Sequence, residues 1–154
     1  MTAQMDHTIE EMQRAVKRRL VAEVATLDYR RAIKHLEHEM RQVDIARALR
    51  VSQPALSSAL KTARKVPDAA PGFSGAGPYE ICQRYAVGEI DREQLLDELV
   101  RWDYPPRPQP EWLEDSAGPD PVGSWAEMER ALWDGLVDDA TYDEVLDRRF
   151  PTSA

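Results

Sequence analysis

Apolar residues recur every three or four positions along much of the chain, which is the spacing of one face of an α-helix. Over the first 40 residues this spacing predicts a helix from about Asp6 to Ala25 and a second one ending near Met40, with Thr26 as its N-cap. A single helix across both segments is the alternative. The first apolar stripe consists of Met5, Ile9, Met12, Val16, Leu20, Val24 and Leu27, and the second of Tyr29, Ala32, Ile33 and Leu36.

Two shorter helices are predicted next, at residues 42–49 and 53–65. Ser52 precedes the second of them as an N-cap, and Pro54 in its first turn gives up no helical hydrogen bond. We expect the two helices to pack on each other through Ile45, Ala46 and Leu49 of the first, Val51 of the turn, and Leu56, Ala59 and Leu60 of the second. Residues 1–65 are therefore expected to form one helical domain with a long N-terminal helix.

The composition changes after residue 65. Residues 66–78 hold three Pro and three Gly, which predicts a linker. Helical spacing returns at residues 79–102 and 125–150, and a Pro-rich spacer at 103–124 separates these two segments. The expected fold class is all-α, with a smaller helical module at residues 79–150.

The segments 79–102 and 125–150 resemble each other at an offset of 47 residues. In each, a helix is followed by a Gly suited to positive φ, an apolar residue, an Asp N-cap and a second helix. We interpret them as two copies of a helical hairpin. The matching pairs are Ile81 and Met128, Tyr85 and Leu132, Gly88 and Gly135, Ile90 and Val137, Asp91 and Asp138, Leu95 and Tyr142, and Leu99 and Leu146.

Charge is divided between the two halves. Residues 1–65 hold 13 Lys and Arg against 8 Asp and Glu, a net charge of +5, whereas residues 66–154 hold 7 against 20, a net charge of -13. These values recover the -8 of the whole chain. A basic half is free to face phosphate while an acidic half faces other partners.

Several classes of protein are not expected. The chain lacks an apolar run of bilayer length and a signal peptide, so we expect a cytoplasmic protein without membrane partners. Phosphate loops, nucleophile elbows and metal-ligand clusters are also lacking, so we expect neither enzymatic activity nor a cofactor or metal. The single cysteine, Cys82, is interpreted as a buried structural thiol.

The outward side of the helix at 53–65 is the strongest functional signal. This side carries short polar side chains followed by cationic ones near the C-terminal end of the helix. Such a surface suits the major groove of double-stranded DNA. Gln can pair with adenine, Ser with base edges or phosphate, and Lys and Arg with the backbone. The candidate DNA-binding residues are Gln42, Arg47, Arg50, Ser52, Gln53, Pro54, Ser57, Ser58, Lys61 and Arg64.

The segment RQVDIARALRVSQPALSSALK resembles the Cro/repressor-like helix-turn-helix superfamily, and the looser likeness extends over about residues 27–65. The resemblance implies that Gln53 to Arg64 is the recognition helix. Arg50 stands where the turn of that family commonly has Gly, so Arg50 is expected to adopt positive φ. A non-Gly residue there costs on the order of 1 kcal/mol.

The expected function is a sequence-specific DNA-binding regulator, in particular a repressor, that acts as a homodimer and carries an acidic protein-interaction module. The long N-terminal helix is the candidate dimer seam. RYAVGEIDREQLLDEL loosely resembles the helical modules of bacterial antitoxins, which makes a DNA- and toxin-binding antitoxin the first alternative. A helical adaptor that does not bind DNA is the second. The four Trp residues are either a small core or an interface.

Overall fold

The computed structural model describes residues 1–112 and 118–152. All regular elements in these ranges are helices, which confirms the all-α class. The chain divides into two compact units, Met1–Asp68 and Ala69–Ala154. No helix in the described ranges has both the length and the apolar character needed to cross a membrane. Part of the predicted Pro-rich spacer, residues 113–117, lies outside the described residues.

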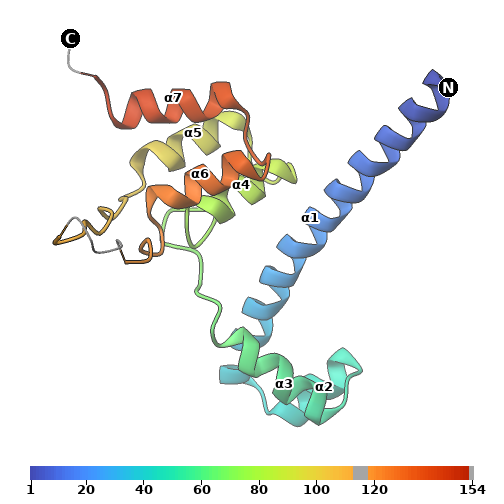
Figure 1. Cartoon of the computed structure of the whole chain (residues 1–154). Coiled ribbons are helices and arrows are strands. Elements are labelled where there is room, and N and C mark those ends of the chain that lie inside the picture. The colour runs from blue at the N-terminus through green and yellow to red at the C-terminus, as the bar shows by residue number, and fades with distance from the viewer. Residues whose placement is uncertain (113–117, 153–154) are drawn as a thin grey trace. The chain divides into compact units, whose positions relative to one another are not determined.

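Unit 1 consists of three helices, α1 (Thr2–Glu39), α2 (Gln42–Leu49) and α3 (Gln53–Ala63) (Figure 1). The expectation that a new helix begins at Thr26 was wrong, because α1 runs through this position without a break. The Thr26 hydroxyl donates to the Ala22 carbonyl oxygen at 2.8 Å, four residues earlier. This hydrogen bond lies inside the helix, so the hydroxyl does not cap the start of a new one.

The core of unit 1 joins all three helices. Ile33 of α1, Ile45 of α2, and Leu56 and Leu60 of α3 are each at most 1% exposed. Ala46 and Ala63 complete this cluster, which we call the three-helix core, and Leu36 and Ala59 pack at its edge. Burial of four large aliphatic side chains is the main favourable term that holds these short helices together.

Two residues expected in this core lie outside it. Leu49 and Val51 are 36% and 38% exposed, so their predicted burial was wrong. Ile33 of α1 occupies the centre of the cluster, so the core does not depend on the turn between α2 and α3 for an apolar side chain. The apolar pattern of α2 and α3 alone does not indicate that α1 supplies a side chain to their core.

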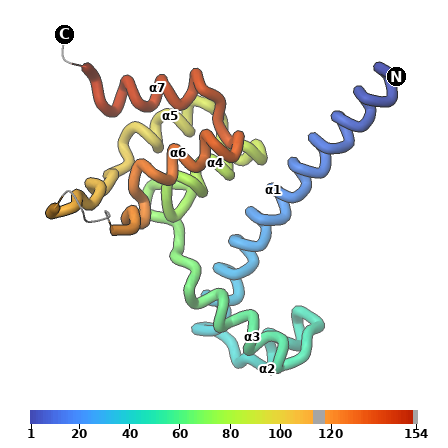
Figure 2. Tube along the Cα trace, viewed as in Figure 1, coloured from blue at the N-terminus to red at the C-terminus, as the bar shows by residue number. Residues whose placement is uncertain are grey.

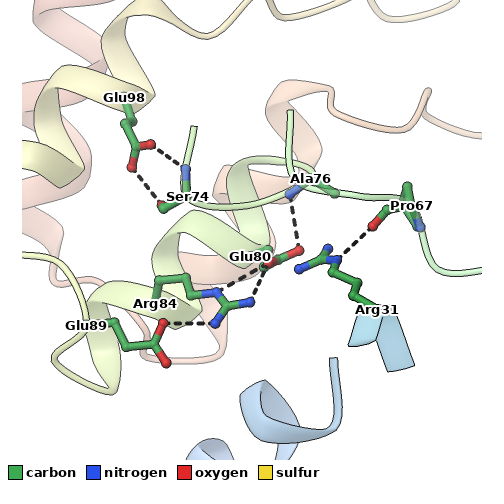
Figure 3. Close-up of polar contacts among 8 residues, drawn as sticks. All are labelled: Arg31, Pro67, Ser74, Ala76, Glu80, Arg84, Glu89 and Glu98. Carbon is green, nitrogen blue, oxygen red and sulfur yellow. Dashed lines mark hydrogen bonds and ion pairs between the residues drawn. The ribbon is translucent and has the colours of Figure 1, made fainter. Parts of the chain in front are cut away.

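The chain that leaves α3 is held against α1. Lys34 Nζ donates to the Val66 carbonyl oxygen at 2.8 Å. Arg31 Nε donates to the Pro67 carbonyl oxygen at 3.0 Å (Figure 3). Asp68 accepts from Lys34 at 2.8 Å and contacts His35 Nε2 at 3.0 Å. The hydrogen bond from Lys34 lowers the pKa of Asp68. These contacts fix the end of unit 1.

Unit 2 is built from four helices, α4 (Pro78–Ala86), α5 (Arg92–Arg101), α6 (Trp125–Trp133) and α7 (Asp139–Arg149). In this unit α4 packs against α5 and α6, and α7 packs against the same two helices (Figure 2). Their shared interior is apolar, and its fully buried side chains are Ile81, Cys82, Leu95, Leu99, Met128, Ala131 and Val145.

The two hairpins of unit 2 use the same local chemistry. Gly88 and Gly135 follow α4 and α6 with φ of 85° and 74°, in the left-handed region that Gly adopts at least cost. The Asp91 carboxylate accepts from Gln94 N at 2.8 Å, and that of Asp138 from Thr141 N at 2.8 Å. Each Asp therefore caps the second helix of its hairpin.

Buried carboxylates tie the segment before α4 to the helices of unit 2. Glu98 of α5 accepts from the Ser74 hydroxyl at 2.7 Å, and Glu80 of α4 accepts from Ala76 N at 3.1 Å (Figure 3). Glu80 is also paired with Arg84 Nη2 at 3.0 Å. Because an unpaired buried charge is costly, these contacts define where the segment lies.

Two of the four Trp residues are partly buried and two are exposed. The Trp102 ring lies 4.8 Å from that of Phe73, and its Nε1 donates to the Gly123 carbonyl oxygen at 2.9 Å. Trp125 stacks edge-on with Tyr104. Trp112 and Trp133 are 74% and 89% exposed. The packing alternative therefore describes Trp102 and Trp125, and Trp112 and Trp133 remain free for an interface.

Cys82 offers a test of the unit 2 core. Burial raises the pKa of its thiol to about 12, so almost no reactive thiolate forms at pH 8. We expect a disulfide reagent to modify Cys82 only as fast as unit 2 unfolds, with rapid reaction in denaturant as the control. Rapid stoichiometric labelling of the folded protein would contradict this structure.

Candidate nucleic-acid interface

The turn between α2 and α3 is set by Arg50. This residue has φ of 58° and ψ of 41°, the left-handed conformation expected from its position. Its backbone N–H donates to the Arg47 carbonyl oxygen at 3.2 Å, and Val51 N donates to that of Ala46 at 3.0 Å. These bonds satisfy the last carbonyls of α2 and turn the chain sharply into α3.

The start of α3 follows from Ser52 and Pro54. The Ser52 hydroxyl accepts from Ala55 N at 3.2 Å, which satisfies one of the free amides of the first turn. Pro54, in the same turn, has no amide hydrogen to satisfy. Both side chains are exposed, so they lie at the surface at the N-terminal end of α3.

The two sides of α3 differ in polarity. Leu56 and Leu60 face the three-helix core, whereas the other side carries exposed Gln53, Ser57, Ser58 and Lys61. We call these four residues the outer face. Among the described residues Lys61 makes no ion pair or side-chain hydrogen bond, and the same is true of the exposed Arg50.

The exposed polar surface of α3 extends past the four residues of the outer face. Thr62 and Lys65 are also exposed, and they lie four residues after Ser58 and Lys61. Helical spacing alone could have identified them, because residues four apart share a face. Thr62 continues this polar surface in the last turn of α3, and Lys65 continues it just after the helix.

Two other candidate residues, Arg64 and Gln42, are engaged within unit 1. Arg64 forms a two-fold contact with Glu37 of α1, in which Nε lies 3.0 Å from Oε2. Gln42 Nε2 donates to the same carboxylate at 3.4 Å. The hydrogen bond from Arg64 lowers the pKa of Glu37, so the carboxylate stays charged at neutral pH. Glu37 thereby links the start of α2 and the end of α3 to α1.

Arg47 shares a carboxylate with a neighbouring arginine. Asp44 accepts from Arg41 Nε at 3.1 Å and lies 3.6 Å from Arg47 NH1. Both guanidinium groups are largely exposed. Exposed ion pairs of this kind are weak and exchange readily for other partners. Both arginines therefore remain available to an external anion.

The comparisons with known proteins give no assignment. Models of protein families, curated proteins and solved structures all yield no match to the chain. The geometry and chemistry of unit 1 therefore carry the functional argument.

The Arg50 turn can be tested by its backbone conformation. Replacing Arg50 with Gly removes the Cβ from a left-handed residue and should raise the free energy of unfolding of unit 1 by about 1 kcal/mol. Arg50→Ala is the matched control, because it removes the same charge and keeps the Cβ, and it should gain nothing. Equal stability of both variants in thermal melts would show that the turn is not strained.

Proposed function

We propose that this protein is a double-stranded DNA-binding regulator in which α2 and α3 form a helix-turn-helix and α3 is the recognition helix. One observation carries the proposal. The outer face of α3 is exposed, polar and cationic, while Leu56 and Leu60 hold the opposite side in the core. A short helix presented in this way fits the major groove, which is wide enough to admit it.

Each residue of the outer face has a role in this proposal. Gln53, at the N-terminal end of α3, pairs with adenine, because recognition helices contact bases mainly through their first turns. Ser57 and Ser58 donate to or accept from base edges. Lys61 lies two turns further on and contacts phosphate. The resemblance to Cro/repressor-like proteins supports this order of contacts.

The arginines around α3 supply the sequence-independent attraction. Arg50 lies in the turn without an ion-pair partner among the described residues, and Arg41 and Arg47 are held only by Asp44. Arg64 has a different role, because its contact with Glu37 positions α3 against α1. The acidic residues of unit 2 are repelled by DNA, so we assign them to another partner.

A homodimeric repressor is the form of regulator that we propose. One recognition helix reads only a few base pairs, and a second copy doubles the length of the sequence that is read. A repressor needs only to occupy its site. Binding of the two α3 helices to DNA is therefore sufficient for repression in this proposal.

A gel-shift titration at low salt, with random and genomic duplexes, tests this function. We expect binding that weakens as salt increases. Lys61→Ala should weaken it for all sequences and reduce the salt slope by about 1, because one phosphate contact is lost. Ser57→Ala should instead reduce the preference for genomic sites.

Arg148→Ala is the control, because this exposed arginine lies on α7 of unit 2. It should leave the affinity for DNA unchanged. If the wild type shifts neither duplex pool at low salt, DNA binding is refuted and the helical adaptor becomes the better account.

An antitoxin is the second candidate function, and exposed Trp133 favours it. This side chain lies at the end of α6 and is 89% exposed, and large exposed aromatic side chains are typical anchors of protein interfaces. In this function unit 1 binds DNA and unit 2 binds a toxin. The negative charge of the second half suits a basic partner.

Quantitative co-purification from the native host tests this candidate. A partner should be recovered in a fixed ratio with the wild type and lost with Trp133→Ala. Trp112→Ala is the matched control, since Trp112 is exposed but lies outside the four helices of unit 2. Recovery of the protein alone at its native level would count against an antitoxin.

A further inference from the structure

The N-terminal half of α1 carries an exposed apolar stripe. Met5, Ile9, Met12 and Val16 are 60%, 48%, 64% and 67% exposed. We call these four residues the α1 stripe. The stripe lies on the part of α1 that extends beyond α2 and α3 in unit 1 (Figure 1). Contiguous exposed apolar side chains on one helix face are typical of an interaction surface.

The stripe does not point toward α2 and α3. At 3.6 residues per turn, it is centred about 120° around the helix from Ile33 and Leu36, which pack in and at the edge of the three-helix core. Val21, which is 47% exposed, lies about 150° from the centre of the stripe. The C-terminal end of α1 therefore packs in the three-helix core, whereas the N-terminal end exposes the apolar stripe on a different side of the helix.

The positions of the apolar residues favour pairing with a second copy in the opposite direction. Read from both ends of the segment 5–20, Met5 matches Leu20 and Ile9 matches Val16, with Met12 beside the centre. Two antiparallel helices would therefore place apolar residues opposite apolar residues along the whole segment. The next residue on this face, Glu23, is charged and interrupts the apolar positions before Leu27.

Charges beside the stripe favour the same direction. Asp6, Glu10 and Lys17 share one flank, about 90° to 130° from its centre. In an antiparallel pair this flank faces the same flank of the second copy, so Lys17 lies at a level between Asp6 and Glu10 of that copy. These side chains point 90° or more away from the seam, so they attract each other at longer range and make no direct contact. In a parallel pair the flank faces the other side of the partner helix, where Lys17 would lie near Arg19 of the second copy. Like charges there would be unfavourable.

We propose that α1 pairs with α1 of a second copy in an antiparallel orientation, through the α1 stripe. The two-fold axis crosses the helices near Met12 and Gln13. The pairing removes Met5, Ile9, Met12 and Val16 of both copies from water, and the match of apolar positions together with the charge of Lys17 favours this direction.

This pairing determines where the recognition helices lie, a consequence that rests on the proposed DNA-binding function. A two-fold axis perpendicular to the helices keeps both Ile33 side chains on the same side of the pair. At 1.5 Å per residue they are about 60 Å apart along the helices. Two turns of B-DNA span about 68 Å, so the half-sites should be two turns apart. Parallel pairing would place the two α3 helices on opposite sides.

Sedimentation of the full chain without DNA tests the seam. We expect a concentration-dependent dimer that Ile9→Gln combined with Val16→Gln converts to a monomer with unchanged helix content. Val21→Gln is the matched control, because it removes an exposed valine from another face of the same helix, and it should remain dimeric. A monomeric wild type at high micromolar concentration, or a dimer that the double variant leaves intact, would overturn the seam.

Disulfide formation tests the direction. Ile9→Cys combined with Val16→Cys should give a covalent dimer on mild oxidation, because the thiol at position 9 of each copy faces the thiol at position 16 of the other copy. Ile9→Cys alone should not, since the two introduced thiols lie far apart. Cys82 is fully buried, so the wild type should form no covalent dimer. A covalent dimer of Ile9→Cys alone would show parallel pairing and overturn the proposal.

The two proposals can fail separately. Both dimer experiments are made without DNA. A monomeric wild type that still shifts DNA would refute the seam and the homodimeric form, and would leave DNA binding by α3 in place. A crosslinked antiparallel dimer that shifts no DNA would refute the DNA-binding function only.

Discussion

The three-helix core is the constraint on which the rest of unit 1 depends. Helices α2 and α3 have 8 and 11 residues, and isolated helices shorter than about 12 to 15 residues are marginal in water. Ile33 of α1 joins Ile45, Leu56 and Leu60, so each short helix is stabilised by packing on the other two. The C-terminal part of α1 therefore supports the candidate DNA-binding surface, and the rest of the helix extends away from α2 and α3.

That packing also decides which side chains of α3 remain free. Once Leu56 and Leu60 are buried, helical geometry directs Ser57, Ser58 and Lys61 outward, and Gln53 is exposed as the first residue of α3. The contact between Glu37 and Arg64 then holds the last turn of α3 against α1. A rigid support and an exposed polar face are the two properties that groove recognition requires. Unit 1 has both within 68 residues.

Local chemistry made much of this fold predictable from the sequence. The bounds of α2 and the N-caps at Ser52, Asp91 and Asp138 follow from residues close together in the chain, whereas the left-handed Arg50 was expected from the resemblance to the helix-turn-helix superfamily. The exposed Val51 and the pairing of Glu37 with Arg64 do not follow from residues close together in the chain. Both depend on contacts between α1 and the later helices, across separations of up to 27 residues, and no local pattern encodes these contacts. The outer face was proposed from periodicity, and its use remains a proposal.

The central claim is that α3 contacts DNA through its outer face, and an NMR titration of the full chain with a short duplex at low salt tests it most directly. The account predicts that the amide signals of Gln53 to Lys61 shift together and return as salt is added. Signals from α6 and α7 should stay in place. Unchanged α3 signals, or shifts confined to unit 2, would contradict the account.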